Sequence, residues 1–266
     1  MSTLAPRSVF LIILLCGAMH AGAISHPDSP LTRQFDEFGD IQASDLIARL
    51  DNLAIHLHED PLAKTFLIVY RTRRDLPGLS NRYAHRMRSY LVRSRGISPQ
   101  RIITVDGGIA GCLRQEVWIA LPGGTAPTPR ADAYLDSYRP AAYKFDEHHY
   151  SLSSDMDGGN VYWSEAPDDL LSYLEAFAEE LRKHPKSTGY LVAYTSYGRD
   201  RSRVGQTMLR RERAFLIKEL GIKPTQIKTV VGGLREWRTM ELWIAQDREA
   251  ARIIPYNRST ARGKKR

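Results

Sequence analysis

Two stretches of this sequence are nearly the same. SPQRIITVDGG spans residues 98–108, and KPTQIKTVVGG spans residues 223–233. Each stretch follows a Gly-Ile pair and leads to a tryptophan strand, VWIA at 117–120 or LWIA at 242–245. Similarity at so long a period indicates a duplicated domain rather than a solenoid of small repeats.

The match extends over most of both copies. Gly96, Gly107 and Trp118 have counterparts 125 positions later, Pro61 has one 124 later, and Phe35 has one 110 later. The change in offset places an extra segment of about 14 residues early in copy two. We therefore expect the following organisation: a signal peptide at 1–23, domain copy one at 33–121, a linker at 122–140, domain copy two at 141–254, and a basic tail at 255–266.

Each copy predicts the same order of elements. A short first strand precedes a helix, whose apolar period is clear at 46–57. TFLIVY (65–70) and GYLVAY (189–194) are β-rich apolar runs typical of buried strands. A second helix, a third strand and a fourth strand follow, and we expect the last two strands to pair as a hairpin. The fold class is α+β: two tandem β-α-β-α-β-β domains, each a mixed sheet with two helices on one face.

Particular residues mark the ends of these elements. We expect Ser44 to be the N-cap of the first helix and Pro167 to lie near the start of its counterpart. Gly96 and Gly221 are expected to end the second helices in left-handed caps. The Gly107-Gly108 pair, like its counterpart in copy two, is expected to form a backbone turn that needs positive φ.

The N-terminal segment predicts export. Arg7 is followed by the apolar run SVFLIILLCGAM, and Ala21-Gly22-Ala23 supplies the small residues of a cleavage site. A membrane anchor is the alternative, but this run is shorter than the ~20 residues that span a bilayer. No other apolar run is long enough to cross a membrane. Cleavage leaves Cys112 as the single cysteine, so packed cores and not an internal disulfide must stabilise the fold.

The composition is that of a globular protein with a basic surface. Hydrophobic residues make up 42% and charged residues 26%, and the net charge is +8. Export argues against a nucleic-acid partner. Anionic envelope polymers or lipid head groups are the expected partners of this charge, and a merely solvated surface is the alternative.

Both copies resemble the OmpA-like C-terminal domain family, which binds peptidoglycan. The shared pattern is a strand ending in Tyr, an Arg-rich helix, and L-x-x-x-G-I-x-x-x-x-I-x-T-x-x-G-G. In this chain it includes Tyr194-Thr195 and GIKPTQIKTVVGG from Gly221, with Tyr70 and GISPQRIITVDGG from Gly96 in copy one. The resemblance covers about 80 residues of each copy and implies a wall-binding, non-catalytic protein.

The family's ligand chemistry implies particular site residues. Its members hold a zwitterionic diaminopimelate group with an Asp after the Tyr-Thr strand and an Arg on the second helix. Here Ser196 stands at the family's Asp position, and Arg211 lies at about the family's distance beyond it. Arg suits this role because its guanidinium binds a carboxylate bidentately.

A repeated Asp–Arg pair offers a substitute for the missing carboxylate. Asp75 and Arg86 are 11 positions apart, and so are Asp200 and Arg211. Each Asp is predicted in the loop after the second strand, and each Arg on the second helix. The pair could frame a zwitterionic group, or it could be a structural salt bridge or two solvated charges.

Other chemical residues form no organised site. His56 and His58 are two apart on a helix, so they face apart and are expected to be surface histidines. Residues 153–160 (SSDMDGGN) lack the ligand spacing of a calcium loop and are expected to form a turn. Cys112 has no visible activating partner, and no Gly-x-Ser-x-Gly signature is present.

We therefore expect a periplasmic or secreted cell-envelope protein that is not an enzyme and uses no metal or cofactor. Its expected ligand is peptidoglycan or another anionic or zwitterionic wall component. A structural or protein-interaction module that has lost the ligand site is the alternative, and an unrecognised hydrolase is a third hypothesis. Ligand identity, domain orientation and oligomeric state stay open.

Overall fold

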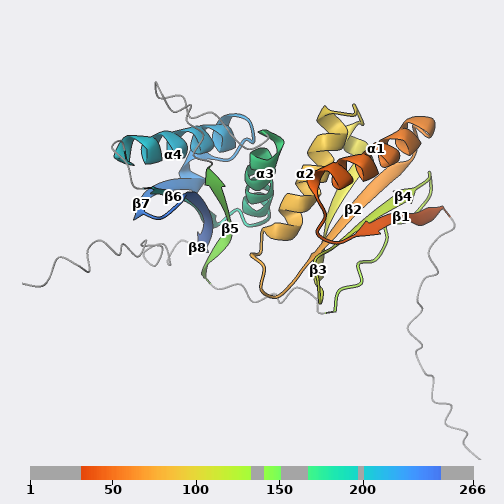
Figure 1. Ribbon diagram of the computed structural model, residues 1–266, viewed down its shortest axis with the longest axis horizontal. Helices are drawn as coiled ribbons and strands as arrows, with labels where there is room; N and C mark the ends of the chain where they lie inside the picture. Colours follow the sequence, from red (N-terminus) through yellow and green to blue (C-terminus); the bar gives the residue numbers. More distant parts are fainter. Residues whose placement is uncertain (1–30, 133–140, 151–166, 197–200, 247–266) are drawn as a thin grey trace, which may run out of the picture.

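The computed structural model describes residues 31–132, 141–150, 167–196 and 201–246, which form eight strands and four α-helices (Figure 1). Residues 1–23, 153–160 and 255–266, for which we predicted a signal peptide, a turn and a basic tail, lie outside the described residues. Copy one contains β1 (Thr32–Phe38), α1 (Ala43–Glu59), β2 (Lys64–Arg71), α2 (Leu79–Arg93), β3 (Ile102–Ile109) and β4 (Arg114–Ala120). Copy two contains β5 (Ala142–Tyr150), α3 (Pro167–Lys183), β6 (Ser187–Thr195), α4 (Arg201–Lys218), β7 (Ile227–Leu234) and β8 (Arg238–Gln246). Short 3-10 turns, Pro99–Arg101 and Pro224–Gln226, precede β3 and β7.

The two sheets share one topology. Their strand orders are β1-β4-β2-β3 and β5-β8-β6-β7. The pairs β2–β3 and β6–β7 are parallel, and the other pairs are antiparallel, so each sheet is mixed as predicted. The prediction of a hairpin between the last two strands was wrong. The second strand lies between them, because its run of apolar residues is buried on both faces and takes a central place in the sheet.

The first helix of each copy buries the same stripe of residues. Leu46, Leu50, Leu53, Ala54 and Leu57 of α1 are buried, and the residues 124 positions later in α3 are buried too. These helical residues pack on one face of their own sheet, where Leu67 and Val69 of β2 contribute to the core. The equal burial confirms the alignment of the copies and the amphipathic period that predicted these helices.

Two predictions about the helix ends had different outcomes. α1 begins at Ala43 after an extended Gln42, and no side chain caps it, so the prediction of Ser44 as N-cap was wrong. Pro167 is the first residue of α3, as expected. Gly96 and Gly221 have φ of 67° and 69°, which confirms the left-handed conformation, although each lies three residues beyond the last helical residue.

The repeated Gly pairs are bulges inside strands and not turns. Gly108 and Gly233 have φ of 90° and 101°, so the prediction of positive φ holds for the second glycine of each pair. The first glycine is needed for a different reason. A Cβ on Gly107 would lie 2.7 Å from the ring of Tyr70, and one on Gly232 would lie 2.6 Å from the ring of Tyr194. Each tyrosine ring therefore lies directly on glycine backbone.

Part of the predicted linker packs on copy one. Residues 121–132, which we call the strap, cross the face of the first sheet opposite its helices. Thr32 of β1 donates to the Thr125 carbonyl at 2.8 Å, and the Asp132 N–H donates to the Ile109 carbonyl of β3 at 3.0 Å. Because β1 and β3 are the two edges of this sheet, the strap spans its whole width.

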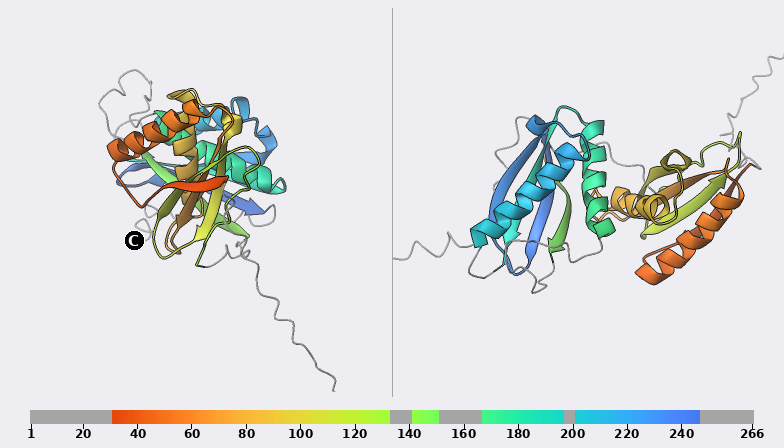
Figure 2. Two further views of the ribbon diagram at one scale, coloured as in Figure 1. Left: turned by 90° about the vertical axis from the view of Figure 1, so that its right-hand side faces the viewer. Right: turned by 90° about the horizontal axis from the view of Figure 1, so that it is seen from above.

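The two copies meet through α2 and α3, which lie side by side between the sheets (Figures 1 and 2). Arg82 of α2 contacts Asp146 of β5 at 3.0 Å, and His85 contacts Glu179 of α3 at 2.7 Å. The backbone N–H of Gly78 donates to the Phe145 carbonyl at 2.8 Å. These charged and backbone contacts hold the duplicated domains against each other. Within the described residues, no helix is both long and apolar enough to cross a membrane.

Candidate functional site

A pocket of about 660 Å³ lies where the parallel strands β2 and β3 end. Both signs of charge line it, because the loop after β2 supplies two arginines and an aspartate, and the strap supplies a second aspartate. The loop after β3 adds small residues that leave the pocket open. The lining residues are Thr72, Arg73, Arg74, Asp75, Ile109, Ala110, Gly111 and Asp132.

Local hydrogen bonds fix the two carboxylates of this pocket. Asp75 accepts a hydrogen bond from the Thr72 backbone N–H at 2.7 Å. Asp132 accepts one from the Gly111 backbone N–H, also at 2.7 Å. These hydrogen bonds orient the two carboxylates in a pocket that Arg73 and Arg74 also line.

The two predicted site residues of copy one, Asp75 and Arg86, both lie near Tyr83. Asp75 lines the pocket, but Arg86 does not. Arg86 is half-buried on α2, where it and Asp75 both act electrostatically on the Tyr83 hydroxyl. Burial raises the pKa of Tyr83, and Asp75 raises it further while Arg86 lowers it. The arginines that line the pocket together with Asp75 are Arg73 and Arg74.

The corresponding region of copy two is described only in part. Ser196 directly follows β6 and is half-buried, and Arg211 is half-buried on α4. Asp200 lies outside the described residues. Arg235 is the copy-two counterpart of Ala110, and it places a guanidinium at this end of the second sheet.

A second group of polar residues recurs on the helix-free face of both sheets. In copy one, the Arg114 guanidinium lies 4.1 Å from the centre of the Tyr70 ring and 3.3 Å from Glu116. The Trp118 indole N–H donates to Glu116 at 3.0 Å. We call the Tyr, Arg, Glu and Trp of each copy the outer-face cluster.

Copy two repeats this arrangement with shorter contacts. The Arg235 guanidinium lies 3.5 Å from the centre of the Tyr194 ring and 2.7 Å from Glu241. The Tyr194 hydroxyl and the Trp243 indole N–H donate to Glu241 at 3.2 Å and 2.9 Å. Each tyrosine ring is thus enclosed between a glycine backbone and an arginine plane.

Burial controls the ionisation of these clusters. It raises the pKa of Tyr70, and it raises the pKa of Tyr194 to about 12, with the Glu241 charge acting in the same direction. Both phenols are therefore protonated at neutral pH. Burial raises the pKa of Glu241, but the hydrogen bonds from Trp243 and Arg235 outweigh it, so the pKa of Glu241 is lowered and the group is anionic.

The outer-face clusters were missed in the sequence analysis. The signal was present as a repeated Glu-x-Trp, at 116–118 and 241–243. Side chains two apart in a strand share a face, which could have joined each Glu to its Trp. The arginines could not be found in this way, because Arg114 and Arg235 occupy different positions of the repeat.

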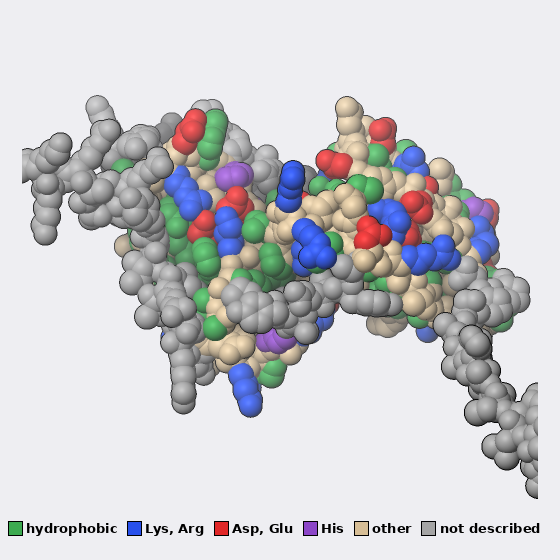
Figure 3. Space-filling model, turned by 90° about the horizontal axis from the view of Figure 1, so that it is seen from below, with side chains coloured by type: hydrophobic (Ala, Val, Ile, Leu, Met, Phe, Trp, Pro, Cys, Tyr) green, Lys and Arg blue, Asp and Glu red, His purple; other side chains and the backbone are tan. Residues whose placement is uncertain are grey.

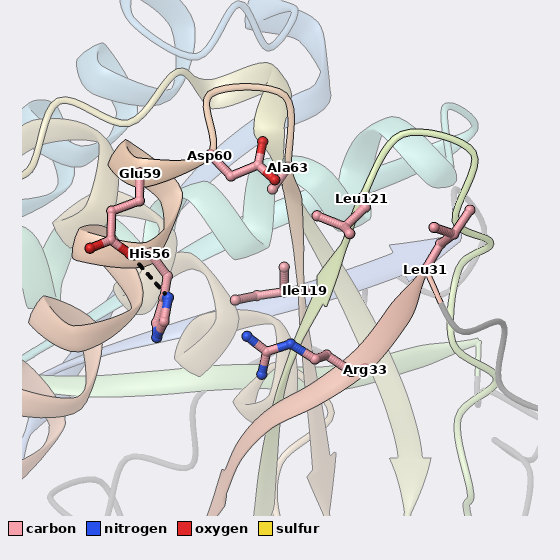
Figure 4. A pocket seen from close by; sticks show the side chains of 8 residues that line it. All are labelled: Leu31, Arg33, His56, Glu59, Asp60, Ala63, Ile119 and Leu121. Carbon is pink, nitrogen blue, oxygen red and sulfur yellow. Dashed lines mark ion pairs between the residues drawn. The ribbon is translucent and has the colours of Figure 1, made fainter.

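A smaller pocket, of about 270 Å³, lies at the opposite end of the first sheet (Figure 4). Arg33 of β1 extends past Ile119 toward His56 of α1, and Leu31 and Leu121 line the other side. His56 lies 3.5 Å from Glu59, one turn along its own helix. His56 and His58 are exposed, as predicted.

The charges do not form one basic patch on the face shown in Figure 3, where side chains of both signs alternate over both copies. Among the described residues, no group of three or more His, Cys, Asp and Glu is placed to hold a metal ion. Cys112 is exposed in the loop between β3 and β4. The chain matches no known protein-family model, and a search of curated proteins finds no match.

Proposed function

We propose that this chain is an exported, non-catalytic protein of the periplasm or cell envelope that binds a zwitterionic wall component. Peptidoglycan is the proposed ligand, in keeping with the resemblance of both copies to OmpA-like domains. The observation that supports this function is the pocket at the end of β2, where Arg73 and Arg74 lie beside Asp75 and Asp132. A zwitterion needs a cation for its carboxylate and an anion for its ammonium group, and this pocket offers both.

Co-sedimentation with purified peptidoglycan sacculi tests the proposal. We expect saturable pelleting of the wild-type protein that survives moderate salt, because charges that touch their ligand directly are screened less than charges that act across solvent. The double variant Arg73→Gln/Arg74→Gln should lose most of this binding, and Asp75→Asn should weaken it.

The matched control is Arg210→Gln on α4, which removes an exposed arginine far from the pocket in sequence. It should leave pelleting unchanged. The double variant Arg86→Ala/Arg211→Ala tests the helix arginines named from sequence. Pelleting that vanishes with slight added salt, or that depends equally on all these arginines, would show non-specific attraction to an anionic polymer and contradict the proposal.

A protein-interaction module is the second candidate function. The contact between α2 and α3 favours it, because that contact makes one two-domain body from the duplicated units. Such a body presents two similar surfaces at a fixed separation, as a bridging protein requires.

A further inference from the structure

The outer-face cluster of copy one holds the backbone of an extended segment. Arg114 donates to the carbonyl oxygen of Arg130 at 3.0 Å, and the Tyr70 hydroxyl accepts the backbone N–H of the same residue at 3.0 Å. Both backbone groups of one strap residue are therefore bound by two side chains of the sheet. Because these two contacts use only main-chain atoms of the bound segment, they recognise its extended shape rather than its side chain at that position.

Copy two contains the same pair of side chains, a tyrosine and an arginine, but only the tyrosine stands at the aligned position. Tyr194 is the counterpart of Tyr70, but Thr239 is the counterpart of Arg114. The guanidinium that covers Tyr194 comes instead from Arg235, which replaces Ala110. Duplication alone would have left the arginine at the aligned position. Each copy therefore supplies the arginine of its cluster from a different position of the repeat, as expected if the cluster has the same function in both copies.

The cluster of copy two retains the required donor and acceptor capacity. Arg235 contacts Glu241 through one terminal nitrogen, and a guanidinium has five N–H donors. Tyr194 donates its hydroxyl proton to Glu241, which leaves the hydroxyl oxygen able to accept an N–H.

We propose that Tyr194 and Arg235 form a backbone clamp that binds an extended, proline-rich peptide segment of another protein. The strap indicates the chemistry of this partner, since it contains Pro122, Pro127 and Pro129. Proline-rich segments adopt the polyproline II conformation, in which the backbone N–H and C=O groups make no internal hydrogen bonds. Such segments bind to surfaces lined with aromatic residues, and the partly buried Trp243, which packs against the cluster that contains Tyr194, supplies an aromatic side chain there.

A synthetic peptide with the sequence of residues 122–132, PGGTAPTPRAD, is the probe. Its binding to the full chain can be measured by fluorescence anisotropy of an N-terminal label. We expect saturable binding that Arg235→Gln and Tyr194→Phe each weaken about tenfold, because each removes one hydrogen bond to the peptide backbone. A peptide methylated on the backbone nitrogen of its arginine cannot donate to Tyr194. It should bind the wild-type chain about as weakly as the unmodified peptide binds the Tyr194→Phe variant.

Arg210→Gln, which removes an exposed arginine of α4 that belongs to neither outer-face cluster, is the control and should not weaken peptide binding. Thermal unfolding of each variant separates a lost contact from a lost fold, and the methylated peptide gives a result that does not depend on any variant. No saturable binding to the wild-type chain would overturn the proposal, as would equal binding of the methylated peptide. Binding that appears only after deletion of residues 247–266 would assign the clamp to a segment of the same chain and also overturn it.

Discussion

Arg82 of copy one neutralises Asp146 of copy two. Asp146 is almost completely buried, with 1% of its side chain exposed, and the Arg82 Nε lies 3.0 Å from it. In copy one the equivalent aspartate, Asp36, is bound by Arg49 of its own first helix at 2.7 Å. The residue equivalent to Arg49 in copy two is Tyr173, and Arg82 lies over its ring at 4.2 Å. The equivalent aspartates are therefore paired differently: Asp36 by an arginine of its own domain, and Asp146 by an arginine of the other domain.

We expect Arg82→Ala to destabilise copy two strongly. Burial raises the pKa of Asp146 and Arg82 opposes that rise, so removal of Arg82 leaves a buried carboxylate without its cation. The loss of one partner from a buried pair is worth about 3–5 kcal/mol of unfolding free energy. Urea unfolding measures it. Arg49→Ala is the control, and it should cost less because the Asp36 side chain is 24% exposed.

The acid sensitivity of the interface should depend on Glu179. Hydrogen bonding from His85, with Lys183 helping, lowers the pKa of Glu179 from 4.5 to about 2. A carboxylate with a lowered folded pKa contributes stability that is fully present above its unfolded pKa and is lost as the pH falls through the folded value. We therefore expect this contribution to disappear between about pH 4.5 and pH 2.

His85→Ala should raise the pKa of Glu179 toward its ordinary value. Acid titration followed by NMR of the Glu179 carboxyl carbon checks this directly. Lys183→Ala is the comparison, and it should raise the pKa of Glu179 less, because His85 is the larger cause. An unchanged pKa of Glu179 in the His85→Ala variant would refute the assignment.

Copy one suggests how to stabilise the core of copy two. His148 and Glu212 are almost fully buried and 2.8 Å apart, while Phe38 and Met87 occupy the equivalent positions of copy one. His148 Nδ1 and one oxygen of Glu212 have no hydrogen-bond partner in the described residues. We expect His148→Phe/Glu212→Met to raise the unfolding free energy by about 1–4 kcal/mol, because apolar packing replaces two incompletely satisfied polar groups and this gain exceeds the loss of the Tyr150–Glu212 hydrogen bond.

The single variant Glu212→Met should have the opposite effect, since it leaves His148 buried without an acceptor. Chemical denaturation of the wild type, both single variants and the double variant forms a complete cycle. A double variant less stable than the wild type would show that the buried polar pair is net stabilising.

Gly232→Ala should destabilise the second sheet through a collision with Tyr194. The new methyl carbon would lie 2.6 Å from the tyrosine ring, which Arg235 holds from the other side. Overpacking of this kind costs about 1–3 kcal/mol. Gly221→Ala is the informative comparison, because nothing lies within 4 Å of that position and only its φ of 69° opposes alanine. Near-UV circular dichroism should report displaced tyrosine in the first variant alone.

The sequence by itself determined the duplication, the order of elements in each copy and the faces of the helices that are buried. These properties depend on local periods and on repeated residues, which the chain carries explicitly: the apolar stripe of α1 reappears 124 positions later in α3. It also indicated Asp75, which lines the pocket. The function drawn from the resemblance stays a proposal.

The tertiary structure alone decided which strands pair, where the guanidiniums lie and how the copies meet. Strand order depends on which strand is buried on both faces. The hairpin prediction was wrong because it assumed that strands adjacent in sequence pair with each other. Arg114 and Arg235 contact equivalent tyrosines but stand at positions of the repeat that do not align, so the constant offset between the copies could not identify them as counterparts. Arg82 contacts Asp146 only when both domains are folded and packed together, because the cation that pairs with this buried carboxylate belongs to the other domain.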